Sequence, residues 1–300
     1  MQFKRIKRRI DGVLLLDKPS GISSNQALQL AKRLFQAEKA GHTGSLDPLA
    51  TGLLPICFGE ATKFSSFLLD ADKSYRALLK LGVTTTTGDA EGEVLERRDV
   101  RANEAQVKSV LQKFVGKILQ TPPMYSALKH QGKPLYEYAR EGIEIERKSR
   151  EVQIHDISLQ RFDQDEIEIL VQCSKGTYIR TLAEDIGESL GCGSHLRGLR
   201  RLTTGHFDLK DALTLEALEA MPMEERDNRL LDVAAAISDL PEVVVDEASA
   251  HYLQQGQRIW KSGVVPPGLL RLYDEQKNFL GVGELMPDGR IAPRRLVKTN

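Results

Sequence analysis

Two neighbouring segments in which apolar and polar residues alternate, 152–159 and 166–173, constrain the fold most strongly. Such alternation predicts a pair of β-strands, each with one face turned toward a core. Three further segments fit short strands, namely residues 12–16, 75–83 and 93–97. Three others repeat apolar residues at helical spacing, namely residues 23–38, 107–118 and 181–190. Because strands outnumber helices without a regular alternation, we predict an α+β fold with a mixed, largely antiparallel sheet.

The chain divides unevenly. Its 300 residues exceed one typical domain. An acid-rich stretch between Glu216 and Glu247 leads into a β-rich end, so we predict a main domain over 1–239 and a small one over 240–300. No apolar run is long enough to cross a membrane, and no signal segment follows the basic start. We expect a protein of the cytoplasm that does not bind membranes.

Cofactor and metal motifs are missing from the sequence. The three cysteines are far apart and form no CxxC pair, which favours reduced thiols. The six histidines never reach metal-ligand spacing with one another or with a cysteine. The run "GCGSHL" lacks the third glycine of a dinucleotide fingerprint, and "SKGT" lacks the upstream glycine of a P-loop. We expect a chemistry that needs neither cofactor nor metal.

Charge is balanced overall but unevenly distributed. Lys and Arg total 42, as do Asp and Glu. Basic residues nevertheless cluster over 4–9, 195–201 and 290–298, while acids dominate 216–247. An even total can therefore conceal a basic face suited to a nucleic acid.

The run "AGHTGSLDPLATGLLP", residues 40–55, contains the main chemical candidate, Asp47. Asp before Pro is typical of a helix N-cap with Pro at the first helical position, so a structural role is the simpler interpretation. We predict a short capped turn here. Spacing alone does not decide between this role and a catalytic one.

The same run closely resembles the signature of the TruB-type tRNA pseudouridine-55 synthases. Five other segments follow that family's pattern in order: "GVLLLDKPSGISSNQAL", "LDADKSYRALLKLGVTTTTGDAEGEV", "PPMYSALKHQGKPLYEYAREG", "CSKGTYIRTLAEDIGESLGCGSHLRGLRR" and "GELMPDGRIAPRRLV". Together they span nearly the whole chain, whereas residues 202–240 match loosely. The resemblance implies the pseudouridine synthase fold, with helices flanking the sheet and a small C-terminal PUA-like domain.

The implied activity is the isomerisation of a uridine in the T-loop of tRNA to pseudouridine. The glycosidic N1–C1′ bond breaks, the uracil turns, and a C5–C1′ bond forms without any cofactor. Because a stacked base is out of reach, the nucleotide must flip into a pocket. The resemblance makes Asp47 the catalytic carboxylate, which could attack C1′, add to C6 or remove the ribose 2′ proton. Arg180 matches the cation expected to keep Asp47 ionised.

Four further positions match family residues around the target nucleotide. Tyr75 matches a tyrosine that packs on the base and assists loss of the C5 proton. Tyr178 and Leu199 match pocket-lining residues, and His42 matches a histidine that contacts RNA near the flipped base. Without the resemblance, each would be interpreted as ordinary packing or turn structure.

RNA recognition is expected to depend on the folded shape of the loop, through phosphate and 2′-OH contacts. We expect an RNA-binding excursion over residues 121–150 and a single copy of the chain bound to the tRNA T-stem-loop. The basic side chains that we assign to RNA contact are Lys18, Lys129, Lys133, Arg140, Arg200 and Arg201.

Two alternatives stay open at the level of sequence. A non-catalytic module that binds or folds tRNA could present the same surface. A nucleosidase or glycosidase could use Asp47 for hydrolysis, but it would need a second carboxylic acid, for which Asp89 is the nearest candidate.

Overall fold

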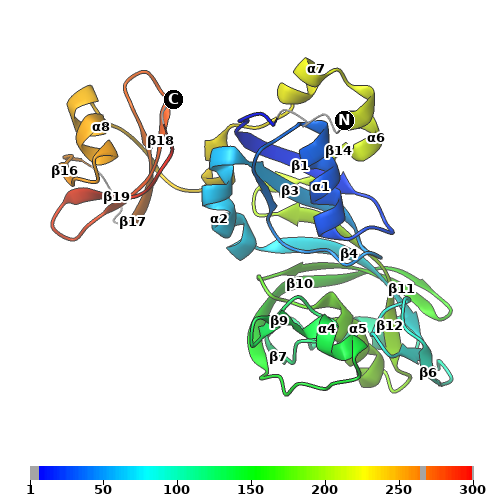
Figure 1. The fold of residues 1–300 in the computed structure, drawn as a ribbon. Helices are drawn as coiled ribbons and strands as arrows, with labels where there is room; N and C mark the ends of the chain where they lie inside the picture. Colours follow the sequence, from blue (N-terminus) through cyan, green and yellow to red (C-terminus); the bar gives the residue numbers. More distant parts are fainter. Residues whose placement is uncertain (1–6, 264–267, 299–300) are drawn as a thin grey trace.

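The computed structural model describes residues 7–263 and 268–298, which form two separate main sheets (Figure 1). Residues 4–6 of the basic N-terminal cluster lie outside the described residues. The larger sheet has ten strands, and its main path runs β14-β1-β3-β12-β4-β11-β10-β7. The strands are β1 (Gly12–Lys18), β2 (Ala40–His42), β3 (Thr51–Phe58), β4 (Lys73–Leu81), β7 (Gly116–Gln120), β10 (Arg150–Asp163), β11 (Glu166–Cys173), β12 (Ser194–Thr204), β13 (Phe207–Asp208) and β14 (Leu213–Thr214).

Pairing in this sheet is mixed and largely antiparallel, as predicted. The pairs β1–β14 and β3–β12 are parallel, and the other neighbouring pairs are antiparallel. In β11, the alternate residues Ile167, Ile169, Val171 and Cys173 are buried, which confirms the period-two pattern of this segment. Because successive side chains of a strand point to opposite faces, the residues between them face the other side of the sheet.

Helices occur at the three places where the apolar spacing predicted them, but the helix predicted over 107–118 is wrong in its last part, because residues 116–118 belong to β7. The helix α1 (Ser24–Leu34) begins with a capping box between Ser23 and Gln26 and buries Ala27, Leu28 and Ala31. The α-helices before the C-terminal sheet are α1, α2 (Ser65–Asp70), α3 (Glu104–Gln112), α4 (Leu135–Arg140), α5 (Ile179–Ser189), α6 (Leu215–Ala220) and α7 (Met223–Asp227). The 3-10 helices are η1 (Gly59–Phe64), η2 (Leu209–Asp211) and η3 (Val233–Ile237).

Two small hairpins extend from the larger sheet. One pairs β5 (Val83–Thr85) with β6 (Val94–Arg97), and the other pairs β8 (Lys129–His130) with β9 (Lys133–Pro134). The second hairpin and α4 occupy the segment 121–150, which leaves the sheet after β7 and returns as β10. This excursion therefore has secondary structure of its own.

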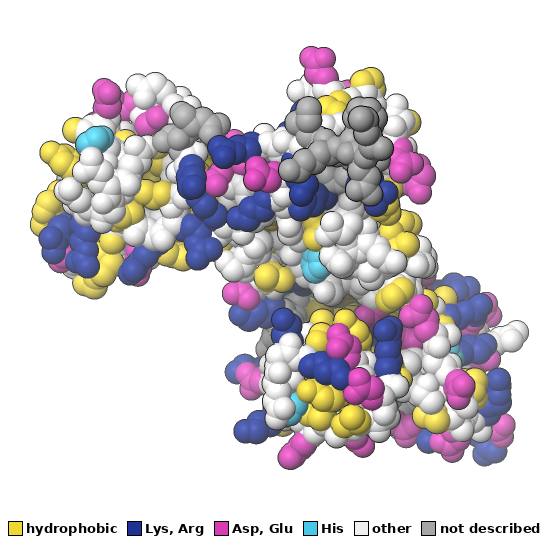
Figure 2. All heavy atoms as spheres, in the orientation of Figure 1, with side chains coloured by type: hydrophobic (Ala, Val, Ile, Leu, Met, Phe, Trp, Pro, Cys, Tyr) yellow, Lys and Arg dark blue, Asp and Glu magenta, His cyan; other side chains and the backbone are white. Residues whose placement is uncertain are grey.

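A five-stranded sheet ends the chain, in agreement with the predicted C-terminal β-rich unit. It contains β15 (Glu242–Val244), β16 (Ile259–Trp260), β17 (Gly268–Tyr273), β18 (Phe279–Leu285) and β19 (Arg290–Leu296), with α8 (Glu247–Gln254) beside them. Phe279 packs on Phe64 at 5.5 Å between ring centroids, and Arg295 donates to the Lys63 carbonyl oxygen at 2.7 Å. Lys and Arg side chains gather where the two sheets approach each other (Figure 2).

The short turn predicted at Asp47 is present, but the predicted helix cap is wrong. Residues 47–50 form a turn in which the Ala50 N–H donates to the Asp47 carbonyl oxygen at 3.0 Å, and no helix follows. The chain instead continues directly into β3 at Thr51, because residues 53–58 are buried in the interior of the sheet as part of this strand.

Candidate active site

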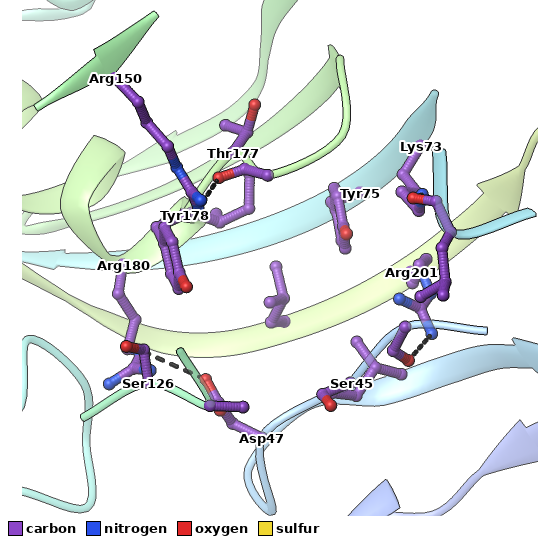
Figure 3. Close-up of a pocket in the computed structure, with 17 residues that line it drawn as sticks. Ser45, Asp47, Lys73, Tyr75, Ser126, Arg150, Thr177, Tyr178, Arg180 and Arg201 are labelled. Atoms are coloured by element: carbon purple, nitrogen blue, oxygen red, sulfur yellow. Dashed lines mark hydrogen bonds and ion pairs between the residues drawn. The ribbon is translucent and has the colours of Figure 1, made fainter. Parts of the chain in front are cut away.

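A pocket of about 280 Å³ opens over the face of β4 and β12. Its wall combines the loop before β3, the start of α5, and part of the 121–150 excursion (Figure 3). Five predicted catalytic or substrate-binding residues line it, namely Asp47, Tyr75, Tyr178, Arg180 and Leu199. Segments more than a hundred residues apart thus meet around one cavity.

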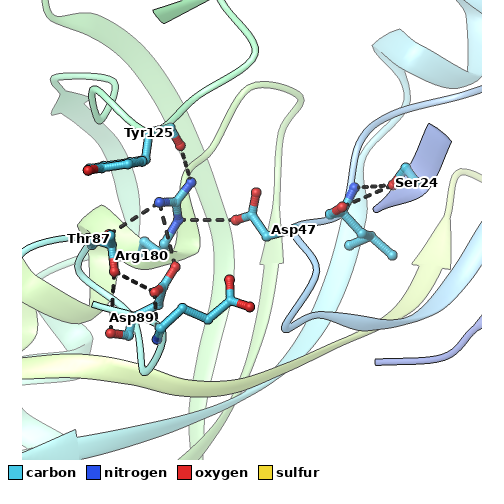
Figure 4. A network of polar contacts seen from close by, with 8 residues as sticks. Ser24, Asp47, Thr87, Asp89, Tyr125 and Arg180 are labelled. Carbon is cyan, nitrogen blue, oxygen red and sulfur yellow. Dashed lines mark hydrogen bonds and ion pairs between the residues drawn. The ribbon is translucent and has the colours of Figure 1, made fainter. Parts of the chain in front are cut away.

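The loop that carries Asp47 is fixed by its neighbours rather than by a helix. The Leu46 N–H donates to the Ser24 hydroxyl at 2.7 Å, and this hydroxyl donates back to the Leu46 carbonyl oxygen (Figure 4). The Leu46 side chain is buried, and the Thr43 N–H donates to the Pro55 carbonyl oxygen. On the other side of Asp47, the Gly21 N–H donates to the Pro48 carbonyl oxygen at 2.9 Å, so the backbone is held both before and after the carboxylate, which is thereby pre-positioned.

Arg180 joins Asp47 to a second carboxylate. Its Nε lies 3.1 Å from Asp47 Oδ2, and its terminal nitrogen lies 3.6 Å from Asp89 Oδ2. The guanidinium also donates to the carbonyl oxygens of Thr87 and Tyr125, at 3.2 and 2.5 Å. Because Arg180 and Asp89 are both buried, these contacts hold the Arg180 guanidinium in one orientation (Figure 4).

Asp47 is the reactive member of the network. Burial of the carboxyl raises its pKa above the ordinary value, the Arg180 cation lowers it, and the nearby Asp89 carboxylate raises it. The Asp47 side chain keeps 44% of its area open, whereas that of Asp89 keeps 4%. Asp47 can therefore reach a ligand in the pocket, whereas Asp89 acts through Arg180. A carboxylate whose pKa is raised and which an adjacent cation keeps ionised can act as a base or a nucleophile.

Tyr75 and Leu199 form the floor of the pocket. Tyr75 lies on β4 and is directly opposite Arg201 on β12, and Leu199 on the same strand is opposite Ala77. Burial raises the pKa of the Tyr75 phenol. The Tyr75 ring offers a flat face on which a base can stack, and Leu199 adds apolar surface beside it.

Tyr178 stands at the entrance, immediately before α5. Its N–H donates to the Gln120 side chain at 3.0 Å, and its ring lies 5.0 Å from the Arg150 guanidinium carbon. Arg150 lines the same pocket and donates to the Gly176 carbonyl oxygen at 2.7 Å. Arg150 was not predicted as a site residue, since no local sequence pattern distinguishes it from other surface arginines that begin a strand.

The structure does not place Lys18 on an RNA-facing surface, which corrects our prediction. The side chain is fully buried, and its ammonium donates to the carbonyl oxygens of Pro19 and Ile22 at 2.8 and 2.6 Å. Burial lowers the pKa of Lys18 to about 8. These two bonds hold the turn that follows β1.

Arg201 requires a similar correction. It is 1% exposed, lines the pocket, and donates to the carbonyl oxygens of Leu53 and Gly44. Its neighbour Arg200 points to the opposite face and makes a two-pronged ion pair with Asp17, at 2.6 Å for the shorter contact. The alternation of β12 separates the two residues that we had assigned together.

The remaining predicted RNA contacts lie away from the pocket. Lys129 is exposed on β8, Lys133 pairs with Glu141 at 2.5 Å, and the Arg140 guanidinium lies over the ring of Tyr136. His42 ends β2 and is outside the pocket wall; its Nδ1 is buried and has no protein partner among the described residues. Burial lowers the pKa of this imidazole, so its neutral form is favoured.

Within residues 7–263 and 268–298, no group of three or more His, Cys, Asp or Glu side chains could hold a metal ion. No helix in these two ranges is both long enough and apolar enough to span a bilayer.

Comparison with known proteins identifies the family. Residues 32–179 match the N-terminal domain of the TruB family of pseudouridylate synthases, and residues 180–240 and 241–297 match two C-terminal domains of TruB synthases. The tRNA pseudouridine synthase B of Methylobacillus flagellatus is 67% identical over 298 residues, which cover 99% of both chains. This chain belongs to the TruB family. The tRNA pseudouridine synthase B of Nitrosospira multiformis is 54% identical over 97% of both chains.

Solved structures agree with this TruB assignment. The chain matches one in the crystal structure of a Cbf5-Nop10-Gar1 complex with a TM-score of 0.71 and 26% identity, over 92% of this chain and 78% of that one. It matches a chain of an H/ACA RNP bound to a substrate RNA containing 2′-deoxyuridine with a TM-score of 0.73 and 22% identity, over 96% and 85%. The second likeness shows the fold alone.

The family resemblance read from the sequence is therefore confirmed. Residues 202–240, which follow the TruB motifs only loosely, lie within the range 180–240 that matches a TruB C-terminal domain. Membership in a family of uridine isomerases favours the catalytic interpretation over a non-catalytic RNA-binding module and over a hydrolase. Asp89, the acid that a hydrolase would need, is committed to Arg180 and is closed to the pocket.

Proposed function

We propose that this protein converts uridine 55 in the T-loop of tRNA to pseudouridine. The observation that carries the proposal is the Asp47–Arg180 ion pair at the edge of a pocket whose floor is Tyr75 and Leu199. A flipped uridine that stacks on this floor would bring its C1′ and C6 toward the Asp47 carboxylate. The related proteins named tRNA pseudouridine synthase B support tRNA as the substrate.

In this reaction Asp47 starts the cleavage of the N1–C1′ bond. It attacks C1′, adds to C6 or removes the 2′ proton, and in each route the ionised form is the reactive one. The uracil stays in the closed pocket, turns, and joins C1′ through C5. The C5 proton then leaves and N1 gains a proton, so the product is an isomer and no cofactor takes part.

The test is an assay on a T-stem-loop transcript that measures pseudouridine and free uracil in the same sample. We expect pseudouridine without free uracil from the natural chain, and a loss of at least about a thousandfold with Asp47→Asn. Asp163→Asn, at the exposed end of β10, is the matched control. Free uracil as the product would instead establish the hydrolase, and normal activity of Asp47→Asn would contradict the proposal.

We further propose that residues 1–239 are the catalytic domain and that 240–300 form a PUA-like RNA-binding domain. Lys129, Lys133 and Arg140 would contact phosphates from the 121–150 excursion, and His42 would contact RNA beside the pocket. Arg200 remains a weaker candidate, because Asp17 already compensates its charge. Binding through phosphates should weaken steeply between low and moderate salt, and a salt-independent affinity would contradict this assignment.

A single chain in the cytoplasm is the form in which we propose that the enzyme works. The three buried, free cysteines Cys57, Cys173 and Cys192 are consistent with a reducing compartment. Light scattering with and without the T-stem-loop measures the stoichiometry, and a dimer in both conditions would contradict a monomer.

A further inference from the structure

Arg201 is a buried cation without a carboxylate partner. Its side chain is among the largest fully buried ones, yet no Asp or Glu of the described residues forms an ion pair with it. Its two protein acceptors are neutral: the carbonyl oxygens of Leu53 at 2.7 Å and Gly44 at 3.2 Å. Burying an uncompensated charge costs several kcal/mol. By contrast, the other buried arginine of the pocket, Arg180, has two carboxylates.

The position of Arg201 brings it against Tyr75. The two residues are directly opposite each other on the antiparallel strands β12 and β4, so their side chains share one face of the sheet. Both line the pocket, and Figure 3 shows the phenol and the guanidinium on the same side of the cavity. The guanidinium has five N–H donors, and the two backbone carbonyls do not use them all.

The backbone around Arg201 is fixed on its other side as well. Arg201 pairs with Gly52 of β3, where φ is +101° and a Cβ atom would lie 2.3 Å from the Arg201 carbonyl oxygen. Through Gly44, three residues before Asp47, the guanidinium also holds the catalytic loop. Arg201 is therefore rigid and connects the Asp47 loop to the strand that carries Tyr75.

We propose that Arg201 is a positioning residue for Tyr75, which it holds through the phenolic oxygen and whose deprotonated form it stabilises. This inference rests on the proposed function. After the C5–C1′ bond has formed, C5 still carries its proton, and the Tyr75 phenolate removes it. The C5–H electron pair becomes the C5=C6 double bond, electrons of the N1=C6 bond move to N1, and N1 takes a proton from water. The neutral phenol returns its proton to water before the next turnover.

The groups that face Tyr75 explain why it requires a cation. Burial opposes ionisation of the phenol, and Cys173 of β11 and Asp47 raise its pKa further, while Arg201 lowers it. The other cations of the pocket have other partners: Arg180 has Asp47, and the Lys73 ammonium donates to the carbonyl oxygens of Leu68, Leu69 and Ala71. The remaining charged group in the wall is Arg150 at the entrance.

A merely structural role for Arg201 makes a different prediction. If it only joined Gly44 to Leu53, its loss would lower the melting temperature and the rate at every pH alike. If it stabilises the phenolate, its loss slows proton removal from C5 in particular, and more strongly at low pH.

The experiment compares Arg201→Met, Arg201→Lys and Tyr75→Phe on T-stem-loops with hydrogen or deuterium at C5 of the target uridine. Single-turnover rates are measured from about pH 6 to about pH 10, the range in which the phenolate fraction rises toward the ordinary tyrosine pKa of about 10. Arg76→Met is the control, because Arg76 follows Tyr75 on β4 but points to the opposite face, where it pairs with Glu168.

We expect the single-turnover rate of Arg201→Met to be about tenfold or more lower near neutral pH. The pH range over which this rate increases should lie about one pH unit or more higher than in the natural chain. A primary C5 isotope effect should appear or grow. Arg201→Lys should retain part of the rate and of the pH profile, and Arg76→Met should match the natural chain. In the Tyr75→Phe background, Arg201→Met should no longer shift the profile.

An unchanged pH profile and no C5 isotope effect in Arg201→Met would overturn the inference, even if the rate fell. Should Arg201→Met fail to fold, the same two readouts in Arg201→Gln decide, because a glutamine amide can still donate to one of the two carbonyl oxygens but carries no charge. If the natural chain itself forms no pseudouridine, the proposed function has failed instead. The two failures are thereby distinguished.

Discussion

The pocket and the C-terminal sheet contain the same kinds of charged side chains but use them differently. At the pocket, Arg180 and Asp89 are almost fully buried, and their geometry is set by four partners on three segments of the chain. On the C-terminal sheet, Lys277 pairs with Glu242 and Arg290 with Asp288 at the surface. Buried ion pairs fix a single geometry at the cost of desolvation, whereas exposed pairs are screened by water.

The two regions are alike in one respect, the use of glycine where strands approach closely. Gly52 in β3 and Gly281 in β18 have φ values of +101° and +130°, and a Cβ atom on either would lie 2.3 Å from a backbone oxygen. At Gly52 the opposing oxygen belongs to Arg201, and at Gly281 it belongs to Arg295. The same substitution at these positions should therefore separate the catalytic region from the C-terminal one.

Removing the pocket cation should have the largest effect. Arg180→Met leaves Asp89 buried without its partner, which should lower the free energy of unfolding by about 3 kcal/mol. Asp47 loses the cation that keeps it ionised, so pseudouridine formation should fall at least about a hundredfold. Denaturant unfolding and the single-turnover rate measure the two effects. Arg161→Met, on the exposed part of β10, is the control, and equal effects of both variants would show that burial does not matter here.

Gly52→Ala should rank next and should differ from Gly281→Ala in kind. Both should lose roughly 2 kcal/mol or more of stability, because alanine is strained at these φ values and its Cβ meets backbone. Gly52→Ala should also slow catalysis, since it pushes β3 away from Arg201. Gly281→Ala should leave the rate on a short T-stem-loop unchanged. An equal fall of the rate in both variants would mean that the C-terminal sheet also affects catalysis, which contradicts this prediction.

Sequence patterns predicted the elements well but the buried charges poorly. The strand β11 was predicted at its observed bounds, because alternation of apolar residues depends on the strand alone. Arg200 and Arg201 looked equivalent in the sequence, whereas one is paired at the surface and the other is sealed in the pocket. That difference depends on which face of β12 meets β3 and β4, and local sequence does not encode it.

The site residues that could be predicted are those that match motifs of the family. Asp47, Tyr75, Tyr178, Arg180 and Leu199 meet around the pocket as the resemblance implied. The cap at Asp47 was wrong because the next segment joins the sheet instead of starting a helix. Asp89 was considered for a hydrolase only, since its contact with Arg180 spans more than ninety residues.

A moderate effect is expected from pH. Burial raises the pKa of Asp47, so activity should decline as the pH falls through a midpoint above the ordinary aspartate value. Arg180→Lys should move that midpoint higher, because a lysine cannot keep the same contacts. A pKa that is raised in the folded state favours the protonated native protein, so the stability from Asp47 is lost as pH rises through that pKa. Asp47→Asn should accordingly be no less stable than the natural chain at neutral pH, as thermal unfolding would show.

The smallest effect should come from the exposed pair of the C-terminal sheet. The Lys277 ammonium lies 2.9 Å from Glu242, but its side chain is two-thirds exposed, so water and salt screen the interaction. Lys277→Met should change the free energy of unfolding by less than about 0.5 kcal/mol and leave the rate on a short T-stem-loop unaltered. Urea unfolding at low and high salt measures this directly. If Lys277→Met lost nearly as much free energy of unfolding as Arg180→Met, the distinction between buried and exposed ion pairs would be contradicted. Both pairs join a cation to a carboxylate, so their burial rather than their residue type is what should separate them.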